Sequence, residues 1–314
     1  MNIKNCLCCH GKSTVIGKKN GYFLAKCQQC GFITTHPLPT EQDIKSFYSK
    51  KYFVKQENSN NQFGYQNVFS QSYRESNINI SRIRLGIIAT ILHRKGAILD
   101  LGCAAGTFLD VAKEQGWDTS GVEINPEMRD IAAKVCVNKI SASIEDVAGV
   151  YEVITMWEYL EHVRKPAEIL QKAGKLLTSG GLLCISFPNI ENRSSIQNQI
   201  GWEHVKPPEH LHYWNAHNIE LLLEKSGFQI VGFRYFGLKM QLEGVRQLGT
   251  RKNPKTIFWP LMSIFFRLTK HLYSTKIRKK FPSWVRKIYE GMEVYAILKI
   301  GCFVLKKAFP DRII

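Results

Sequence analysis

The chain has 314 residues, of which 44% are hydrophobic and 22% are charged. This composition is ordinary for a globular protein and excludes disorder along the whole length, and the length suits one large domain or two modest ones. The formal net charge of +17 is uneven, because residues 238–314 hold 17 Lys and Arg against 4 Asp and Glu, a net of 17 − 4 = +13. Such a basic tail favours an acidic partner surface, either a membrane or a nucleic acid.

The N-terminal sequence MNIKNCLCCHG lacks the apolar stretch of a secretory signal. No uninterrupted run of apolar residues reaches the length of about 18 that a membrane-spanning helix requires. We therefore predict a cytoplasmic protein. Five of the nine cysteines lie within the first thirty residues, and in a reducing compartment such clustering favours metal binding over disulfides.

Two C-x-x-C pairs lie 17 residues apart and together supply four thiols, those of Cys6, Cys9, Cys27 and Cys30. This spacing is typical of a zinc ribbon, in which four thiolates satisfy the tetrahedral preference of Zn²⁺ and leave no open position. We therefore predict a structural zinc site in residues 1–38. The alternatives are unliganded thiols, or a site in which Cys8 or His10 replaces one of the four.

Residues 39–95 form a predicted helical and irregular connector that folds over a site as a lid. Thr40 is placed to cap a short helix, with Asp43 three residues later. Residues 55–80 are rich in Asn, Gln and Ser and favour irregular structure. Helical spacing of isoleucines then predicts a helix over residues 81–92.

Residues 96–237 alternate between strand and helix patterns, which predicts a mostly parallel sheet with helices on both faces. The predicted strands are AILDLG, DTSGVEI, YEVITMW, GGLLCISFPN and FQIVGFRYF. The predicted helices are TFLDVAKEQG, PEMRDIAAKV, PAEILQKAGKLL and NIELLLEKSG.

A glycine loop follows the first of these strands, in the sequence ILDLGCAAGTFLD. Gly102 permits a tight turn, Gly106 permits close approach to a ligand, and Thr107 is placed to cap the helix. A dinucleotide fingerprint would have glycine where this chain has Ala104. Glu123 ends the next strand, 123 − 102 = 21 residues after the first glycine, where an acidic residue binds ribose hydroxyls.

Four segments carry a resemblance to class I S-adenosylmethionine-dependent methyltransferases: LDLGCAAGTFL, GVEINP, IED and YEVITMWEYLEHVRKP. They occur in the family's order between residues 98 and 236. The resemblance implies a Rossmann-like doubly wound sheet of seven strands with the last strand antiparallel, and S-adenosylmethionine as the cofactor. A sulfonium carries no phosphate, so alanine at position 104 is acceptable.

The same resemblance implies roles for individual residues of the cofactor site. The backbone of residues 102–106 and the side chain of Asp100 would face the methionine part, and Glu123 would bind the ribose. Ile144 and Glu145 would lie near the adenine, and Met156 and Trp157 would close the pocket. The alternatives are ordinary ones: Ile144 and Trp157 as core, and Glu145 as a solvated charge. The full predicted set is Asp100, Gly102, Ala104, Gly106, Glu123, Ile144, Glu145, Met156 and Trp157.

The cysteine pairs, HPLPTEQDIKSFYSKKYF, EYLEHV, FPN and PPEHLHYW together are similar to bacterial methyltransferases encoded with cell-surface glycan genes, which include sugar C-methyltransferases. That resemblance implies a sugar, a sugar nucleotide or a lipid-linked glycan precursor as the methyl acceptor. The chain is too short for the second α/β domain of the sugar C-methyltransferases. Methylation of oxygen is therefore at least as well supported as methylation of carbon.

Two clusters after predicted strands offer a base for the acceptor's proton. Glu161 and His162 follow the fourth strand, and PPEHLHYW follows the fifth. The resemblance favours His210 with Glu209 as the base, with His162 second; histidine titrates near neutral pH. The alternative is that these side chains only hydrogen-bond the backbone. No ligand spacing supports a second metal among these histidines.

The C-terminal part divides into a basic insertion, residues 238–290, and a last strand with tail, residues 291–314. TIFWPLMSIFFRLTKHLY places apolar residues on one helical face between basic runs. Residues 256–290 therefore suit peripheral contact with an anionic membrane, or packing on the body or a partner subunit. GMEVYAILKI suits the last strand, with a helix over AILKIGCFVLKKAF as the alternative.

Two rival functions remain open at this point. An RNA methyltransferase would use the ribbon and the positive charge. However, the ribbon lacks a basic stripe, and MWEY stands where base-methylating enzymes carry an Asn/Asp-Pro-Pro-aromatic signature, so we favour a small-molecule acceptor over nucleic acid. A scaffold that binds cofactor without catalysis is the second rival.

Overall fold

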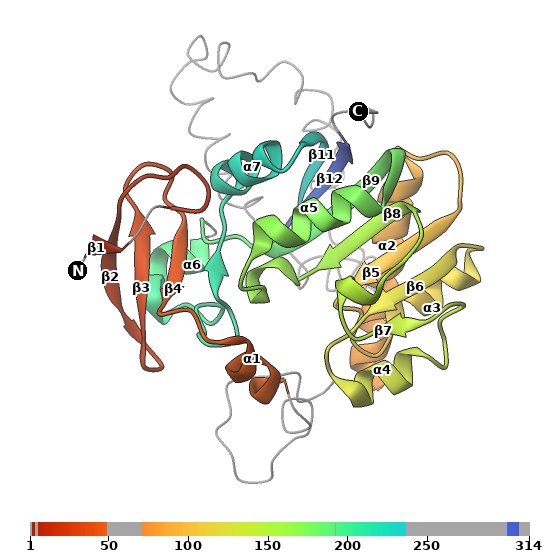
Figure 1. Cartoon of the computed structure of the whole chain (residues 1–314), viewed down its shortest axis with the longest axis horizontal. Helices are drawn as coiled ribbons and strands as arrows, with labels where there is room; N and C mark the ends of the chain where they lie inside the picture. The colour runs from red at the N-terminus through yellow and green to blue at the C-terminus, as the bar shows by residue number, and fades with distance from the viewer. Residues whose placement is uncertain (1, 4–5, 49–70, 192, 237–299, 308–314) are drawn as a thin grey trace, which may run out of the picture.

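The computed structural model describes residues 2–3, 6–48, 71–191, 193–236 and 300–307. These residues form a small N-terminal sheet and a larger sheet with helices on both faces (Figure 1). The predicted insertion, residues 238–290, and its amphipathic segment, residues 256–290, lie outside the described residues. In the part of the chain that is described, no helix is both long and apolar enough to cross a bilayer.

The larger sheet has seven described strands. In spatial order they are β11 (Phe228–Phe236), β12 (Ile300–Lys307), β9 (Leu177–Pro188), β8 (Tyr151–Trp157), β5 (Ala97–Leu101), β6 (Asp118–Val122) and β7 (Ile140–Ser141). Strand β12 is antiparallel to both of its neighbours, and the pairs from β9 to β7 are all parallel. The predicted parallel α/β sheet is thus confirmed.

The last strand differs in position from its prediction. It begins at Ile300, at the end of the segment GMEVYAILKI, and continues through GCFVLKK, for which a helix was the alternative. Residues 291–299 lie outside the described part.

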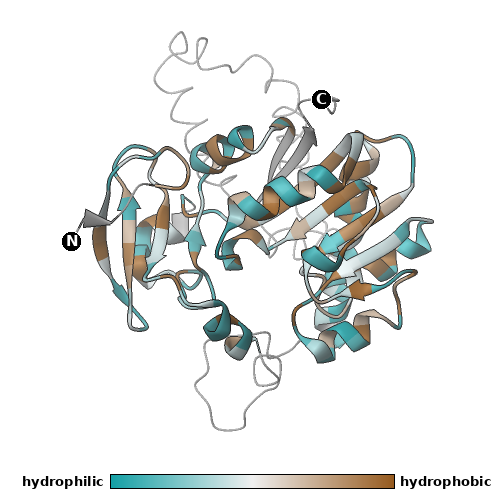
Figure 2. Ribbon diagram, viewed as in Figure 1, coloured by the Kyte–Doolittle hydropathy of each residue, from teal (hydrophilic) through white to brown (hydrophobic). Residues whose placement is uncertain are grey.

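Helices cover both faces of the larger sheet because its strands bury side chains on both sides. On β5, Leu99 and Leu101 belong to one apolar cluster, and Ile98 belongs to the other. The first cluster includes residues of α5 (Pro166–Leu176) and α7 (Ala216–Lys225), and the second includes residues of α2 (Gln71–Ala89) and α3 (Thr107–Glu114). Figure 2 shows hydrophilic and hydrophobic bands alternating along α5 and α7, as expected for half-buried helices.

The helix-start predictions have mixed outcomes. Thr40 caps α1 (Glu41–Phe47) in a capping box with Asp43, which confirms that prediction. The prediction that Thr107 caps α3 is wrong. Gly106 is the N-cap, with a φ of 79° and no side-chain cap bond, and Thr107 is the first helical residue. Helix α4 (Pro126–Ala132) is capped by Asn125.

Helix α2 begins ten residues earlier than the sequence suggests, at Gln71 rather than at Ser81. The prediction of irregular structure is therefore wrong for residues 71–80. Packing overrides the polar composition there, because α2 lies along α3 and Ile78 contacts the apolar cluster of that face. The buried side chains of α2 include Leu85 and Ile88, whereas Ile83 is 42% exposed.

The small sheet contains a strand from a distant part of the chain. Its order is β1 (Asn2–Ile3), β2 (Ser13–Lys19), β3 (Tyr22–Cys27), β4 (Ile33–His36) and β10 (His212–Tyr213), with every pair antiparallel. Strand β10 comes from PPEHLHYW, so the segment that carries the candidate base is an edge of the N-terminal sheet. This pairing was not predicted.

Aromatic packing joins the two sheets. The ring of Phe32 lies 4.6 Å from that of Trp214 and 5.6 Å from that of His212, centroid to centroid. Phe32, Trp214 and four buried cysteines belong to the same apolar cluster as the strands of the larger sheet. The two sheets therefore share one core at this seam. Short helical segments complete the described fold: α6 (Arg193–Asn198), η2 (Ile144–Asp146), η3 (Leu160–His162) and η4 (Gln199–Gly201).

Candidate functional site

The glycine loop lies at the carboxyl end of β5 and requires glycine at two positions. Gly102 has a φ of +79°, and a Cβ there would lie 2.5 Å from the ring of Tyr159. Gly106 also has a φ of +79°, and a Cβ there would lie 3.0 Å from the backbone of Ala132. Larger residues would be strained by the left-handed backbone and would clash as well. The loop is thus enclosed by Tyr159 on one side and by α4 on the other.

Glu123 binds the backbone of this loop. One carboxylate oxygen accepts the N–H of Ala104 at 2.9 Å, and the other accepts the N–H of Asn125 at 2.7 Å. The side chain is 6% exposed, and burial raises its pKa against the effect of these two bonds. Ala104 itself has a left-handed φ of 46°. The predicted ribose ligand and the predicted loop are therefore in direct contact.

Asp100 is buried beneath the loop, on the edge of β5 that faces β8. It accepts a hydrogen bond of 2.6 Å from the hydroxyl of Thr155. Burial raises the pKa of Asp100 to about 7, against the hydrogen bond from Thr155 and the positive charge of Arg84. Neither Thr155 nor Arg84 was expected from the sequence. Arg84 lies on α2, a helix predicted only from its apolar residues, so no local pattern marked it.

Trp157 ends β8 and lies between two helices. The guanidinium of Arg84 is 4.3 Å from the centroid of the Trp157 ring, and the ring of Phe108 is 5.5 Å away and edge-on. The indole N–H is buried and has no hydrogen-bond partner among the described residues. Met156, its neighbour, is fully buried in the apolar cluster of the α5 face.

The two residues predicted near the adenine are placed differently from each other. Ile144 is 6% exposed and belongs to the same apolar cluster as Met156. Glu145 is exposed, and its carboxylate pairs with Lys172 on α5. The structure therefore brings Ile144 into the body of the fold, whereas the side chain of Glu145 extends along the surface.

His162 and His210, the two predicted bases, are brought together. Their rings are 4.7 Å apart and nearly perpendicular. Nδ1 of His162 lies 2.8 Å from the backbone oxygen of Glu209 and 2.7 Å from the hydroxyl oxygen of Tyr48. Burial lowers the pKa of His162 to about 4 and that of His210 well below its ordinary value. Both imidazoles are therefore neutral at neutral pH and able to accept a proton or bind a metal.

Glu209 contributes mainly through its backbone. Its side chain is 1% exposed, and its carboxylate pairs with Lys206. Its carbonyl oxygen faces His162, as described above. The carboxylate predicted as part of the base is thus already neutralised by a lysine.

Two further carboxylates lie beside the histidines. Glu161 is 1% exposed, and neither of its carboxylate oxygens has a hydrogen-bond partner in the described part of the chain. Oε1 of Glu158 is likewise buried and unpartnered there. Burial raises the pKa of Glu158 to about 6 and that of Glu161 well above its ordinary value. Glu161 was a candidate from the sequence, whereas Glu158, three residues earlier in WEYLEH, was missed.

The small sheet holds the histidine loop in place. The hydroxyl of Thr35 donates to the backbone oxygen of His210 at 3.2 Å, and the N–H of Thr35 donates to the backbone oxygen of Leu211 at 2.8 Å. On the other side, the N–H of Leu211 donates to the backbone oxygen of Glu161 at 2.8 Å. Residues 210–211 are therefore hydrogen-bonded both to β4 of the small sheet and to η3, the short segment that follows β8 of the larger sheet.

Tyr48 links the loop end of the site to the histidine end. Its hydroxyl contacts His162, and its backbone oxygen accepts a bond of 2.8 Å from the side chain of Asn125. The N–H of Asn125 in turn donates to Glu123. Tyr48 was missed because it appears in the sequence only as the residue that ends a short helix.

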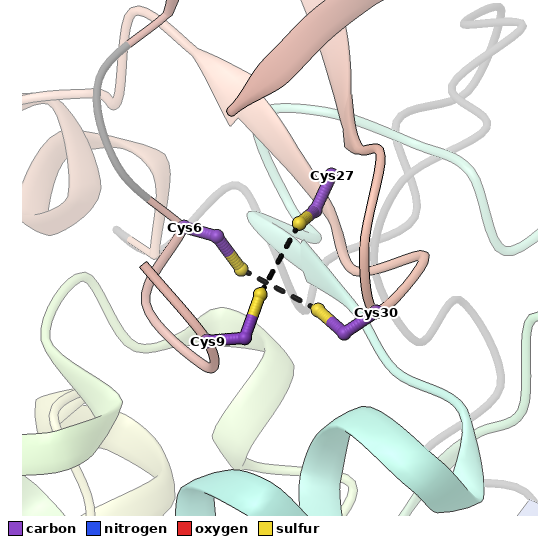
Figure 3. Close-up of side chains that lie close together, drawn as sticks. All are labelled: Cys6, Cys9, Cys27 and Cys30. Atoms are coloured by element: carbon purple, nitrogen blue, oxygen red, sulfur yellow. Dashed lines mark hydrogen bonds between the residues drawn. The ribbon is translucent and has the colours of Figure 1, made fainter. Parts of the chain in front are cut away.

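The four predicted zinc ligands converge on one point (Figure 3). The sulfurs of Cys6 and Cys30 are 3.5 Å apart, those of Cys9 and Cys27 are 3.4 Å apart, and all four lie within 4.8 Å of one another. Zn–S bonds of about 2.3 Å in a tetrahedron place sulfurs about 3.8 Å apart. The arrangement therefore fits a tetrahedral thiolate site. Cys8 and His10 are not members of this group.

Comparison with known families gives one match, to the family described as "Methyltransferase domain", over residues 73–232. This range is slightly more than half of the chain. It contains the glycine loop, Glu123 and both histidines, and it excludes the four cysteines.

Curated relatives include the ubiquinone biosynthesis O-methyltransferase of Pectobacterium carotovorum subsp. carotovorum, 30% identical over 140 residues. That match covers 40% of this chain and 58% of the relative. The protein of the same name from Escherichia coli O9:H4 is 28% identical over 141 residues, again covering 40% of this chain and 58% of the relative. The chain thus matches somewhat over half the length of these relatives.

Solved structures with a similar fold include an SAM-dependent methyltransferase from Archaeoglobus fulgidus, with 19% identity and a TM-score of 0.48. The similarity covers 73% of this chain and 94% of that one. The magnesium protoporphyrin IX methyltransferase of Synechocystis PCC 6803 has 14% identity and a TM-score of 0.46, covering 63% and 94%. From the family match over residues 73–232, we conclude that the chain belongs to the methyltransferase-domain family.

Proposed function

We propose that this protein is an S-adenosylmethionine-dependent methyltransferase that methylates an oxygen atom of a small molecule. One observation carries the proposal. Strands β5 and β8 are neighbours at the point where the strand order reverses, and ligands bind at such a point in open α/β sheets. Asp100, the loop 102–106 and Glu123 line the carboxyl end of β5 and β6, and Trp157 and the two histidines follow β8 and β9.

The residues at the loop fit this cofactor. Each oxygen of Glu123 accepts one backbone N–H and keeps a lone pair for a ribose hydroxyl. Asp100 and Arg84 offer opposite charges for the ammonium and carboxylate of a methionine group. The indole N–H of Trp157, which has no hydrogen-bond partner within the described residues, offers a donor beside them. When bound, S-adenosylmethionine supplies a methyl group on a sulfonium, and the protein's part is to align it with the acceptor.

The histidine end suits the acceptor's hydroxyl. A neutral imidazole takes up the proton that an oxygen loses when it is methylated, and such a base contributes about 10²–10⁴-fold to the rate. His210 is our first candidate for this base, and His162 is the second. We assign Glu209 to positioning rather than to proton transfer, because Lys206 pairs with its carboxylate.

The acceptor class is supported from two sides. The curated relatives are named as O-methyltransferases of ubiquinone biosynthesis, which supports oxygen as the methylated atom. The cysteine pairs and PPEHLHYW resemble glycan methyltransferases, which supports a sugar, a sugar nucleotide or a lipid-linked glycan precursor. We propose that the acceptor is a sugar, a sugar nucleotide or a lipid-linked glycan precursor with a free hydroxyl.

We further propose that the four cysteines hold a structural Zn²⁺, so that residues 1–38 form a zinc ribbon. The four sulfurs fit a tetrahedral site, and four thiolates leave no position open for a substrate. Strand β10 attaches the histidine loop to this sheet. The zinc would therefore fix the position of His210 through β4, although it lies outside the reaction.

A binding and turnover experiment tests the function. Calorimetry with S-adenosylmethionine should give one site per chain, and transfer of labelled methyl to a panel of hydroxyl compounds should identify the acceptor. The panel should hold sugar nucleotides, lipid-linked glycan precursors, phenols and RNA. Absence of cofactor binding would refute the proposal. Transfer to RNA alone would replace the small-molecule acceptor with a nucleic acid, and binding without any transfer would favour a scaffold.

The basic segment 256–290 supports a second, weaker proposal of peripheral contact with an anionic membrane. Its charge and its apolar residues at helical spacing suit an interfacial helix. Sedimentation with phosphatidylglycerol vesicles should retain the full chain at low salt and release it at high salt. Equal binding to neutral vesicles, or none to either, would contradict this contact.

A further inference from the structure

A second group of metal-binding side chains lies at the histidine end of the site. It consists of Glu161, His162 and His210, each of which offers a ligand atom within 4.8 Å of the others. We call these three residues the Glu-His cluster. Glu161 and His210 are 1% and 4% exposed. The cluster is separate from the four cysteines and contains no sulfur.

The tautomer of His162 is set by its surroundings. A carbonyl oxygen only accepts hydrogen bonds, so the 2.8 Å contact with the Glu209 backbone assigns the proton to Nδ1. Nε2 then carries a lone pair, and it lies 4.0 Å from Oε1 of Glu161. In metal sites, a ligating histidine commonly donates its other N–H to a backbone carbonyl in this way.

The centre of the cluster is rich in acceptors and poor in donors. Both oxygens of Glu161, and Oε1 of Glu158 next to them, have no hydrogen-bond partner within the described residues. A buried ionised carboxylate without a partner costs several kcal/mol, so such groups are normally paired with a cation. The two nearby cations have other contacts: Lys206 pairs with Glu209, and Arg84 stacks on Trp157. Either a proton or a metal ion is needed between these acceptors.

We propose that the Glu-His cluster binds one divalent transition-metal ion, in addition to the metal of the four cysteines. Bonds of about 2.0–2.2 Å to imidazole nitrogen and carboxylate oxygen bridge ligand atoms up to about 4 Å apart. The 4.0 Å between Nε2 of His162 and Oε1 of Glu161 meets this limit, and small side-chain shifts bring in His210. Two imidazoles and one carboxylate suit Zn²⁺, Mn²⁺, Fe²⁺ or Co²⁺ and leave coordination positions open.

The open positions give the ion a use, and this step rests on the proposed function. A metal ion that binds the acceptor's hydroxyl lowers the pKa of that hydroxyl and fixes its orientation. His162 and His210 would then act by holding the ion rather than by taking the proton themselves, and the proton that the hydroxyl loses would pass to water. The acceptor class narrows accordingly to molecules with a hydroxyl that can approach a metal, such as a phenol or a sugar diol.

Titration with Mn²⁺, followed by electron paramagnetic resonance, tests the site directly. Mn²⁺ prefers oxygen and nitrogen ligands, so it reports on the Glu-His cluster while zinc stays with the cysteines. The full chain should remove about one equivalent of Mn²⁺ from the free signal. Glu161→Gln and His162→Gln should each weaken this binding by about 10-fold or more. Two ligand variants are used so that one remains informative if circular dichroism shows the other to be unfolded.

His204→Gln is the matched control. The ring of His204 stacks on His210 at 6.0 Å but contributes no atom to the cluster, so this variant should bind Mn²⁺ like the wild type. Wild-type protein that binds neither Mn²⁺ nor additional Zn²⁺ would overturn the proposal and would leave a shared proton between the acceptors. Unchanged binding by both ligand variants would overturn it as well. No cofactor or acceptor is added, so a failure of methyl transfer would not affect this result.

Discussion

The two sheets of this protein are stabilised in different ways. The larger sheet buries apolar side chains on both faces against helices α2, α3, α5 and α7. The small sheet has one cluster of its own, formed by Leu24, Ile33, Trp202, Val205 and Tyr213, and three of these residues come from beyond position 200. A sheet with so little apolar burial of its own usually needs a metal or a disulfide. The zinc that we propose at the four cysteines would meet this need.

The difference matters for function because the sheets meet at the site. The histidine loop follows β9 of the larger sheet, yet it pairs through β10 with the small one. The loop of Gly102 and the carboxylate of Glu123 lie within the larger sheet. We therefore expect damage to the small sheet to affect the acceptor end of the site, and damage to the larger sheet to affect the cofactor end.

The largest effect should come from Cys30→Ser. Loss of one thiolate should remove the metal, because structural zinc binding of about 10–16 kcal/mol is part of the folding free energy of such units. We expect the methyl-transfer rate to fall by about 10³-fold or more, while cofactor affinity stays within a few-fold of wild type. Metal analysis, calorimetry and labelled-methyl transfer give the three readouts.

Cys136→Ser is the control for this variant. Cys136 is also buried, but its thiol bonds the backbone oxygen of Thr119 in the larger sheet. It should keep about one zinc per chain and most of the rate. A Cys30→Ser protein that retains full activity without metal would show that the two sheets do not depend on each other.

Glu123→Ala should have the next largest effect, confined to the cofactor. Hydrogen bonds to a charged group contribute about 1.5–3 kcal/mol each, and the same change frees the N–H of Ala104. Affinity for S-adenosylmethionine should fall by about 10²-fold in calorimetry, with the zinc content unchanged. Asp130→Ala, an exposed acid on α4, is the control. Wild-type affinity in Glu123→Ala would contradict the cofactor assignment.

The sequence predicted the features of each sheet that depend on local spacing. The C-x-x-C pairs indicated the four sulfurs that now converge, and the glycine loop with Glu123 indicated a contact that the structure contains. Both predictions rest on local spacings of Cys, Gly and Glu that are typical of one kind of site. The alternation of strands and helices was equally local, because a buried strand and an amphipathic helix differ in period.

The features that join the two sheets were not predicted. Strand β10 is two residues long and pairs with β4, more than 170 positions away. Thr35, Tyr48 and Arg84 act through contacts with distant segments, and nothing in their own sequence marks them. Glu158 looked like an ordinary surface acid until the burial of its Oε1 was known, and Glu161 was a candidate whose burial was not predicted. Such contacts arise from tertiary packing between distant segments, and the periodicity of a single sequence reveals only local structure.

Asp100→Asn should change stability by a few kcal/mol, in a pH-dependent way. The pKa of Asp100 is raised by burial from 3.8 to about 7 in the folded chain. The folded state therefore holds a proton that the unfolded state has lost, and stability falls as pH rises from about 4 through about 7. Asparagine keeps an acceptor for Thr155 and has no proton to lose. In urea titrations of cofactor-free protein, the variant should gain stability relative to wild type across this range.

The difference between the two proteins isolates Asp100, because other buried acids such as Glu158 titrate in both. At about pH 4 the two should be nearly equal, and above about pH 8 the variant should be more stable. A difference that does not change with pH would show that Asp100 is already ionised near its ordinary pKa. That result would indicate that the positive charge of Arg84 lowers the pKa of Asp100 as much as burial raises it.

The smallest effect, and the sharpest test of the seam, should come from Thr35→Val. This change removes the hydroxyl that bonds the backbone oxygen of His210, and one such bond contributes about 1 kcal/mol. The backbone bond from Thr35 to Leu211 remains, so β4 and the loop should stay paired. We expect kcat to fall by about 3–10-fold with KM for the cofactor unchanged, and Thr35→Ser, which restores the hydroxyl, to recover most of the rate. Thr14 is half-buried on β2 of the same sheet, and Thr14→Val should leave kcat near wild type.

Two outcomes would contradict this role of Thr35. If Thr35→Ser is as slow as Thr35→Val, then the loss of packing around the side chain is responsible, and the hydroxyl does not position His210. If both variants match wild type, then the Thr35 hydroxyl does not position His210, and the backbone bonds of Thr35 and Leu211 are sufficient to hold the histidine loop.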